Sequence, residues 1–279
     1  MKIGIIGGTG LYKFTIGNDS ENVFIDTPFG EHSKPIIKSK YGKHELFFLP
    51  RHGEGHHFLP TTINYRANIW ALKSLGVNTV ISVSSVGSLQ ENIHPKDVVV
   101  IDQFFDRTKH RVDSFFQNGL VGHIPFAYPI CKNLADELYR AGKNITKNIH
   151  NTGTYVNIEG PQFSTLAESN FYRKMDFDVV GMTNITEAKL AREAQMHYAT
   201  LAMVTDYDCW KEDEIVTIEK ILENLSYNSE SAMKIIKEFL NIFEMEEDCG
   251  CRTVLDNAIL SNGKGLDNKL KEKYNILFK

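Results

Sequence analysis

Residues 59–88 read LPTTINYRANIWALKSLGVNTVISVSSVGS and carry the strongest sign of the chain's architecture. Leu59–Leu75 predicts a helix, because apolar side chains recur at helical spacing, Pro60 suits the first position and Gly76 suits the residue just past the end. Thr79–Val83 then predicts a buried strand. Four small residues follow that strand: Ser84, Ser85, Gly87 and Ser88. A helix that leads into a buried strand is typical of an α/β protein.

Further strands are predicted on both sides of this stretch. Lys2–Gly7 is a short apolar run that ends in glycine, and Asp178–Met182 and Tyr198–Thr205 are later runs rich in β-formers. Two more strands are expected at Asp97–Phe105 and Tyr155–Ile158. Strands that alternate with helices predict an α/β sandwich around a largely parallel sheet. In such sheets, ligands bind at the carboxyl ends of the strands.

The remaining helices are expected towards the C-terminus. Asn184 can cap a helix, with Glu187 three residues further on in a capping-box position. A long helix packed on the sheet is predicted by an apolar stripe, namely Ala232, Ile235, Ile236, Phe239, Leu240 and Phe243. Residues 246–279 are polar and poorly patterned, so we expect an irregular C-terminal tail. The whole chain, residues 1–279, is expected to form a single domain.

Composition and charge exclude several classes of protein. The chain has 42% hydrophobic and 24% charged residues, which argues against a disordered or collagen-like chain. It has no apolar run of the ~18 residues that a membrane span needs, and its start does not predict a signal peptide. The net charge of −4 predicts no nucleic-acid surface. A bound anion must therefore be held by local groups rather than by a general positive field.

The cysteines predict a reduced, cytoplasmic protein. There are four, Cys131, Cys209, Cys249 and Cys251, with no C-x-x-C pair. Cys249 and Cys251 flank one glycine, and they are either two free thiols or a strained disulfide. We expect no zinc site, because this spacing is poor for zinc and no second cysteine pair exists.

Two glycine-containing segments are candidate anion sites. Gly7-Gly8-Thr9-Gly10 lacks the G-x-G-x-x-G spacing of a dinucleotide site, but its backbone N–H groups and the Thr9 hydroxyl can hold an anion. The second segment is Pro50-Arg51-His52-Gly53-Glu54-Gly55-His56-His57. Its Arg51 fork and the His52 imidazole favour phosphate, with a structural role or a metal site as alternatives.

Two strand ends carry the other candidate groups. The hydroxyls and backbone N–H groups of Ser84 and Ser85 can close the same anion pocket, although a plain strand end would look the same. Asp206 and Asp208 follow the last predicted strand, and residues two apart on a strand share a face. Two close carboxylates raise one pKa, which suits a general acid. A solvated strand end and a D-x-D metal site are the alternatives.

Seven motifs together resemble one enzyme family, the S-methyl-5'-thioadenosine phosphorylases, which belong to the trimeric purine nucleoside phosphorylases. The resemblance runs in order from about residue 2 to residue 240. The motifs are GGTGL at 7–11, PRHG at 50–53, NYRANI at 64–69, VGSL at 86–89, DQFFDRT at 102–108, IEGPQFS at 158–164 and TDYDCW at 205–210. The resemblance implies an α/β/α sandwich with a mixed, largely parallel central sheet, and a homotrimer.

The resemblance also implies a reaction and a set of site residues. The reaction is cleavage of S-methyl-5'-thioadenosine by phosphate to adenine and 5-methylthioribose 1-phosphate, a step of purine and methionine salvage that needs no metal and no cofactor besides phosphate as co-substrate. Phosphate would be held by Thr9, Arg51, His52, Ser84, Ser85 and Thr183. The nucleoside would be bound by Phe163, Met182, His123, Asp208 and the catalytic Asp206, and Ser164 and Ile218 would set specificity.

The chain also departs from the pattern of this family. Glu54 stands where the family often has arginine, Ser84 and Ser85 replace a common threonine and alanine, and the tail after Met245 matches poorly. Some relatives carry a disulfide in a C-terminal Cys-x-Cys, which the resemblance extends to Cys249 and Cys251. Three other functions stay open: a phosphorylase of 6-oxopurine nucleosides or methylthioinosine, a dinucleotide-dependent oxidoreductase, and a non-catalytic nucleoside-binding protein.

Overall fold

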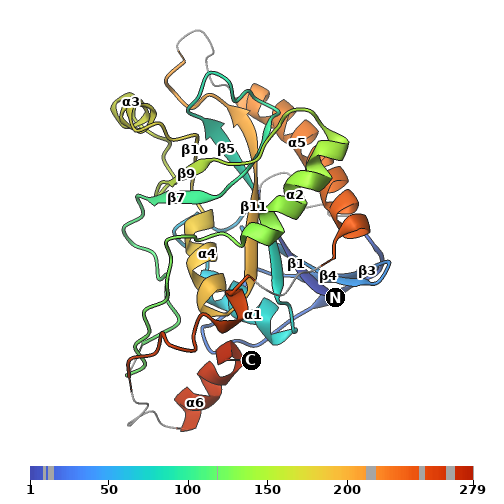
Figure 1. Ribbon diagram of the computed structural model, residues 1–279, viewed down its shortest axis with the longest axis vertical. Coiled ribbons are helices and arrows are strands. Elements are labelled where there is room, and N and C mark those ends of the chain that lie inside the picture. The colour runs from blue at the N-terminus through green and yellow to red at the C-terminus, as the bar shows by residue number, and fades with distance from the viewer. Residues whose placement is uncertain are drawn as a thin grey trace.

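The computed structural model (Figure 1) describes residues 1–8, 11, 16–117, 119–211, 218–244, 249–261 and 268–278. Its strands are β1 (Lys2–Gly7), β2 (Asn18–Val23), β3 (Ile36–Tyr41), β4 (His44–Pro50), β5 (Thr79–Ser88), β6 (Val98–Val100), β7 (Gln103–Asp106), β8 (Ile149–His150), β9 (Thr154–Asn157), β10 (Val179–Gly181) and β11 (His197–Asp206). Its helices are α1 (Tyr65–Ser74), α2 (Lys132–Ile145), α3 (Leu166–Lys174), α4 (Asn184–Glu193), α5 (Ile218–Ile242) and α6 (Asn268–Asn275), with two 3-10 turns, η1 (Cys251–Thr253) and η2 (Ile276–Phe278).

The strands form one mixed sheet with β5 at its centre. β5 pairs in parallel with β1 on one edge and with β11 on the other. Parallel pairs also join β1 to β4, β9 to β10 and β7 to β9, whereas β10 runs antiparallel to β5. The predicted largely parallel sheet is therefore confirmed.

One edge of β5 has a gap between its two partners. β1 pairs with β5 as far as Val83, where Gly7 lies opposite it. β10 pairs with the end of β5 only at Gly87 and Ser88. Ser84–Val86 therefore has no described strand on this edge, and its backbone polar groups face a space that a ligand can enter.

Helices cover both faces of the sheet and complete an α/β/α sandwich (Figure 1). α1 and α4 pack together on one face, and α2 and α5 pack together on the other. The six residues of the apolar stripe predicted for the long helix are all buried, and this helix, α5, packs on α2 and β11. The helix prediction is confirmed there, and its amphipathic face fixes α5 over the central strands.

Two predicted helix starts are wrong. α1 begins at Tyr65 rather than near Pro60, because the Asn64 side chain accepts a hydrogen bond from the Ala67 N–H and caps the helix there. The N-cap of α4 is Thr183, and its side chain makes no capping hydrogen bond. Asn184 is fully buried and donates instead to three hydroxyls of the core. At α4, tertiary partners therefore replace the local capping role that the sequence predicts for Asn184.

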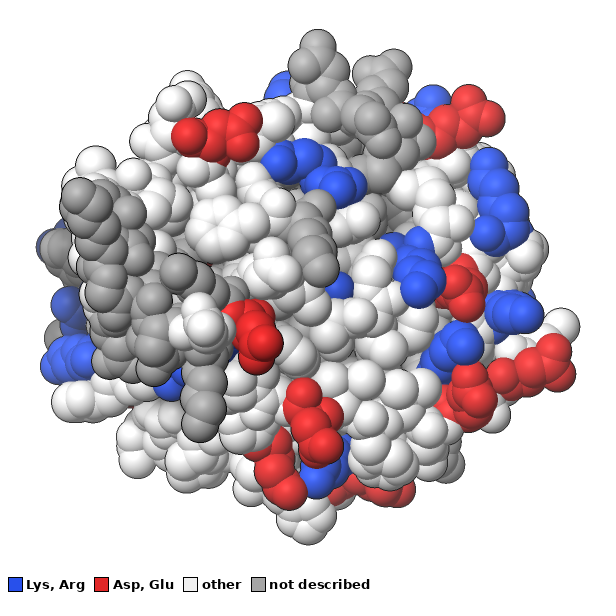
Figure 2. All heavy atoms as spheres, turned by 90° about the horizontal axis from the view of Figure 1, so that it is seen from below, with Lys and Arg blue, Asp and Glu red and all other residues white. Residues whose placement is uncertain are grey.

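The described parts of the tail are more regular than expected. They contain η1, α6 and η2, and the tail folds back on the body of the chain, where Gly122 bridges Ile259. Among the described residues, no helix is long and apolar enough to cross a membrane. Figure 2 shows one face on which basic and acidic side chains are interspersed, without a continuous basic stripe among its described residues.

Candidate active site

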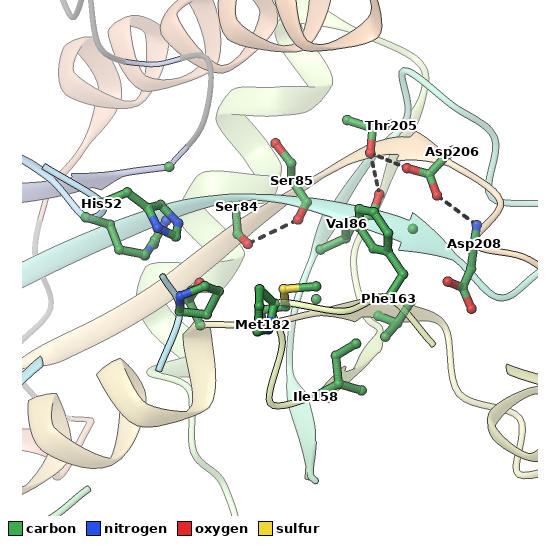
Figure 3. Close-up of a pocket in the computed structure, with 18 of the residues that line it drawn as sticks. His52, Ser84, Ser85, Val86, Ile158, Phe163, Met182, Thr205, Asp206 and Asp208 are labelled. Carbon is green, nitrogen blue, oxygen red and sulfur yellow. Dashed lines mark hydrogen bonds between the residues drawn. The ribbon is translucent and has the colours of Figure 1, made fainter. Parts of the chain in front are cut away.

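A pocket of about 370 Å³ opens beside the gap in the edge of β5. Its walls come from the ends of β5, β10 and β11 and from the segments that follow β4 and β9. This is the position predicted from the sequence, at the carboxyl ends of strands. Figure 3 shows His52 and Ser84 at one end of the pocket and Asp206 and Asp208 at the other. The volume is sufficient for a small-molecule ligand.

The first end of the pocket is rich in hydrogen-bonding groups. Ser84 and Ser85 lie in the unpaired stretch of β5, and the Ser84 Oγ is 3.2 Å from the Tyr155 hydroxyl. Thr183 lies at the N-terminus of α4, where backbone N–H groups and the helix dipole favour an anion. His52 adds a buried imidazole. Together with Arg51, these residues are five of the six that are predicted to hold phosphate, and the structure brings them to one pocket.

The protonation of His52 is set by one backbone carbonyl. Its Nδ1 lies 2.7 Å from the Phe58 carbonyl oxygen, which only accepts, so the neutral ring carries its proton on Nδ1. Burial, together with the charge of Arg51, lowers the pKa of His52 to about 4. The ring is therefore neutral at pH 7, and its Nε2 offers a lone pair. In this state the ring can accept a hydrogen bond at Nε2.

Arg51 is held by Glu187, a residue for which the sequence predicts a capping-box role. Its guanidinium donates to both carboxylate oxygens of Glu187, and it also donates to the Ser82 Oγ and the Val83 carbonyl. Burial alone would lower the pKa of Arg51, but the charge and hydrogen bonds of Glu187 outweigh burial and raise it. The Arg51 Nε and Nη2 groups, which the sequence predicts as phosphate donors, thus already donate to Glu187. Arg51 lines the pocket through its Nη1 side, which faces Gly8.

The other end of the pocket carries the paired carboxylates. Asp206 accepts hydrogen bonds from the Thr205 hydroxyl and from the Asp208 backbone N–H, at 2.7 and 2.8 Å. Burial raises the pKa of both carboxyls, and the charge of Asp206 raises that of Asp208 further. The predicted reason for their shared orientation is wrong, because β11 ends at Asp206 and Asp208 has a left-handed backbone with φ of 54°. The turn after β11, rather than the alternation of side chains along a strand, brings Asp206 and Asp208 to the same pocket.

Three predicted nucleoside contacts lie between the two ends. Met182 and Phe163 flank the space in Figure 3, and Ser164 lines the pocket beside Phe163. The Phe163 side chain is 72% exposed, so its ring is available to a planar ligand. The Ser164 hydroxyl is buried and makes no hydrogen bond among the described residues. An unpartnered hydroxyl in a pocket is a ready partner for a polar ligand.

Three predicted residues are not brought to this pocket by the described chain. Thr9 lies outside the described residues, and of Ile218 only the backbone is described, at the start of α5. His123 is exposed, and its backbone N–H donates to the Ala258 carbonyl of the tail. Within one chain it does not line the pocket.

Residues that the sequence did not predict support the pocket from behind. Glu187 fixes Arg51, and Arg111 is a buried cation that donates to the side chain and carbonyl of Glu159 and to the Met182 carbonyl. Tyr155 holds the Ser84 hydroxyl. Glu187 shares α4 with three other charged residues, Lys189, Arg192 and Glu193, so no local signal in the sequence marks it as the partner of a buried cation.

Comparisons with known proteins show the family to which the chain belongs. Residues 2–241 match the family model described as the phosphorylase superfamily. The S-methyl-5'-thioadenosine phosphorylase of Koribacter versatilis is 46% identical over 99% of this chain and 95% of its own length. That of Thermosynechococcus vestitus is 50% identical, and the match covers 99% of this chain and 97% of that protein.

Solved structures give the same result. The crystal structure of a methylthioadenosine phosphorylase from an Antarctic soil metagenomic library superposes with a TM-score of 0.94, at 44% identity, over 99% of this chain and 98% of that one. The methylthioadenosine phosphorylase of Schistosoma mansoni in complex with adenine has a TM-score of 0.85 at 34% identity, over 93% and 99% of the two chains. The fold and the site define a nucleoside phosphorylase. The chain belongs to the phosphorylase superfamily and, within it, to the family of the S-methyl-5'-thioadenosine phosphorylases.

Proposed function

We propose that this enzyme cleaves S-methyl-5'-thioadenosine with phosphate, to give adenine and 5-methylthioribose 1-phosphate. The observation that carries the proposal is one pocket with two chemically different ends. Neutral donors and a helix N-terminus lie at one end, and two carboxyls with raised pKa values lie at the other. Phosphate suits the first end and a purine suits the second, which leaves the ribose C1' between them.

Hydroxyls, backbone N–H groups and one imidazole bind the phosphate. The Ser84 and Thr183 hydroxyls, the Ser85 N–H and the N-terminus of α4 donate to the anionic oxygens. The His52 Nε2 accepts the one proton that the phosphate dianion carries. Arg51 contributes its charge and the N–H on its Gly8 side, and Thr9 adds a hydroxyl. Phosphate is the nucleophile, so the protein needs no nucleophilic side chain.

Asp206 acts as the general acid that protonates the leaving purine. The C1'–N9 bond breaks and its electron pair goes to the purine, while a phosphate oxygen forms the new bond to C1'. A protonated Asp206 gives its proton to N7, so that adenine leaves neutral, and Asp206 regains a proton from water afterwards. Burial favours the protonated form of this carboxyl before the reaction. The phosphate dianion below the ring stabilises the positive charge that develops at C1'.

Recognition of the nucleoside is assigned to the residues between the two ends. Asp208 accepts from the exocyclic amine of adenine, and Phe163 covers the face of the base. Met182 lies along the ribose, and Ser164 and Ile218 set specificity. His123 reaches the 5' end from a neighbouring copy in a homotrimer. We also propose a cytoplasmic enzyme of purine and methionine salvage, in agreement with the free thiols of the four cysteines.

One incubation tests the reaction. The purified enzyme is mixed with S-methyl-5'-thioadenosine with and without phosphate, and free bases are measured by chromatography. We expect adenine only when phosphate is present. Efficient release of hypoxanthine from inosine, with little release of adenine, would favour the 6-oxopurine alternative. Nucleoside binding without turnover would contradict catalysis and leave a binding protein.

A further inference from the structure

A second cluster of reactive side chains lies outside the pocket. It consists of Cys131, His197, Cys249 and Cys251, whose ligand atoms all lie within 4.8 Å of one another. Cys131 precedes α2, His197 begins β11, and the two other cysteines come from the tail. Three of the four residues are buried. The proposed reaction uses none of them.

The fold supplies what the sequence pattern lacks for a metal site. We expected no zinc because Cys249 and Cys251 have no second cysteine pair along the chain. In three dimensions, Cys131 and His197 take the place of that pair. Three thiols and one imidazole form one of the donor sets found at structural zinc sites, in which all four ligands come from the protein.

The distances between the ligand atoms are close to the edges of a zinc tetrahedron. The His197 Nδ1 lies 3.5 Å from the Cys131 Sγ and 3.1 Å from the Cys249 Sγ. With Zn–S of ~2.3 Å and Zn–N of ~2.0–2.1 Å, tetrahedral geometry separates two ligand atoms by roughly 3.5–3.8 Å. The first of the two distances lies in this range, the second is shorter, and no pair of ligand atoms is more than 4.8 Å apart. Shifts of the side chains within these limits place all four atoms around one ion. We propose that Cys131, His197, Cys249 and Cys251 bind one zinc ion that fastens the tail to the core.

Local backbone structure favours the arrangement. Gly250 has φ of 68° and ψ of 1°, a left-handed conformation that carries Cys249 and Cys251 to the same side. Cys131 is the N-cap of α2, where the helix dipole stabilises a thiolate. A cavity of about 160 Å³ reaches Cys131 and His197, and its lining includes Asp136, Glu137 and Glu244. These carboxylates would attract a cation to the site.

A disulfide is the competing arrangement for this cluster. It would join two sulfur atoms and would leave a third thiol and the imidazole without a function. All four cysteines of the chain are free in the structure, and all three sulfurs of the cluster face one ring nitrogen or one another. A metal would use the imidazole and all three thiols as ligands, whereas a disulfide would use two thiols only.

Metal content and a cobalt spectrum test the proposal. The full-length enzyme, with any affinity tag removed, is purified in the presence of reductant and without chelator, and zinc is measured by mass spectrometry. We expect about one zinc per chain, and at least a tenfold lower content in the Cys249→Ser/Cys251→Ser variant. Cys209→Ser is the matched control, because this cysteine is exposed and outside the cluster, and it should keep its zinc.

Cobalt binding by wild-type enzyme gives a readout that does not depend on a variant folding, and thermal unfolding gives a third readout. Cobalt added to metal-depleted wild-type enzyme should produce the intense visible bands of tetrahedral thiolate coordination. Removal of the metal should lower the melting temperature of wild type but not that of the double variant.

A wild-type enzyme that takes up neither zinc nor cobalt under reducing conditions would overturn the proposal. So would a bound metal whose amount is unchanged in the double variant. Either result leaves the phosphorolysis assay unaffected, so failure here is distinct from failure of the proposed function.

Discussion

Arg51 shows how one side chain serves both stability and the pocket. It is 1% exposed and is paired through two N–H groups with Glu187, whose side chain is equally buried. Removing one partner of a buried pair leaves an uncompensated charge, which costs far more than the pair contributes on balance. A substitution of Arg51 is therefore expected to lower the stability of the fold, and this effect has to be separated from any change in phosphate affinity.

Glu187→Gln is expected to destabilise the enzyme by about 3–5 kcal/mol, because Arg51 then stays buried without a counter-charge. The free energy of unfolding is measured by urea denaturation. In the double variant Arg51→Met/Glu187→Met the loss should be clearly smaller than the sum of the two single losses. Additive losses would show that the two side chains do not depend on each other.

Asp206→Asn should move the preference from 6-aminopurine to 6-oxopurine nucleosides. In the wild type, the Asp208 carboxylate would face the oxygen of a 6-oxo group, which leaves an acceptor unpaired. An amide at position 206 cannot transfer a proton to N7, so adenine release slows, but its N–H can donate to that oxygen. Such an unpaired buried group costs roughly 1–3 kcal/mol, so the ratio of kcat/KM for inosine over adenosine should rise about ten- to a hundredfold. A ratio that stays fixed or falls would remove Asp206 from base recognition.

Glu193 is expected to make stability depend on pH. Burial raises the pKa of this carboxyl from 4.5 to about 7, although it accepts hydrogen bonds from the Ser114 hydroxyl and the Phe115 N–H. A raised pKa in the folded state means that folding takes up a proton between these two values. The stabilising contribution is complete below pH 4.5 and is lost as pH rises to about 7, a change of roughly 2–4 kcal/mol.

The Glu193→Gln variant tests this directly. Its amide stays neutral, so its unfolding free energy should fall less steeply than that of wild type across this pH range. Urea denaturation at several pH values provides the comparison. Parallel curves for the two proteins would place the pH dependence elsewhere.

Among the structural elements, β10 packs closely against the Tyr155 side chain at Gly181, and Tyr155 in turn contacts β5. A Cβ built on Gly181 would lie 2.0 Å from the Tyr155 hydroxyl oxygen, closer than any real contact. That hydroxyl also contacts the Ser84 Oγ, which lines the phosphate end of the pocket. A change in the packing of β10 against Tyr155 is therefore expected to move the Ser84 side chain of β5.

Gly181→Ala should displace Tyr155 and weaken both stability and phosphate binding. Overpacking of this kind costs typically about 1–3 kcal/mol, and the KM for phosphate should rise more than the KM for the nucleoside. Thermal unfolding and steady-state kinetics measure the two effects. Tyr155→Phe is the control, because it removes the hydroxyl and its contact with Ser84 without adding a methyl group. A Gly181→Ala enzyme with wild-type stability would show that the site is less crowded than described.

The sequence predicted strands better than it predicted helix ends or side-chain partners. Tyr198–Thr205 was predicted as a strand and β11 spans His197–Asp206, because a continuous apolar run is a local signal. The start of α1 was misplaced because the capping bond of Asn64 competes with Pro60. Asp206 and Asp208 were correctly grouped, but the pairing of Glu187 with Arg51 joins residues far apart in the chain. No local pattern encodes such a pairing.

At the level of the whole molecule, the proposed contact between His123 and the 5' end of the nucleoside involves a second copy of the chain. His123 is exposed and lies on the segment that pairs with the tail. A neighbouring copy would have to provide it.

The enzyme is expected to be a trimer of three 31.7 kDa chains in solution. Light scattering coupled to size exclusion at micromolar concentration measures the mass. In a trimer, His123→Ala should raise the KM for methylthioadenosine while leaving the KM for phosphate unchanged. A monomer would contradict the assembly and the role of His123 together.

The central place of β5 also has a consequence during synthesis on the ribosome. β1 is already available when β5 emerges, but the partner of its other edge, β11, begins only at His197. At about 5–20 residues per second, translation leaves that apolar edge open for on the order of ten seconds. An open, apolar strand edge pairs readily with other chains. The nascent chain should therefore need shielding by chaperones, and products that end before β11 should aggregate rather than persist as soluble fragments.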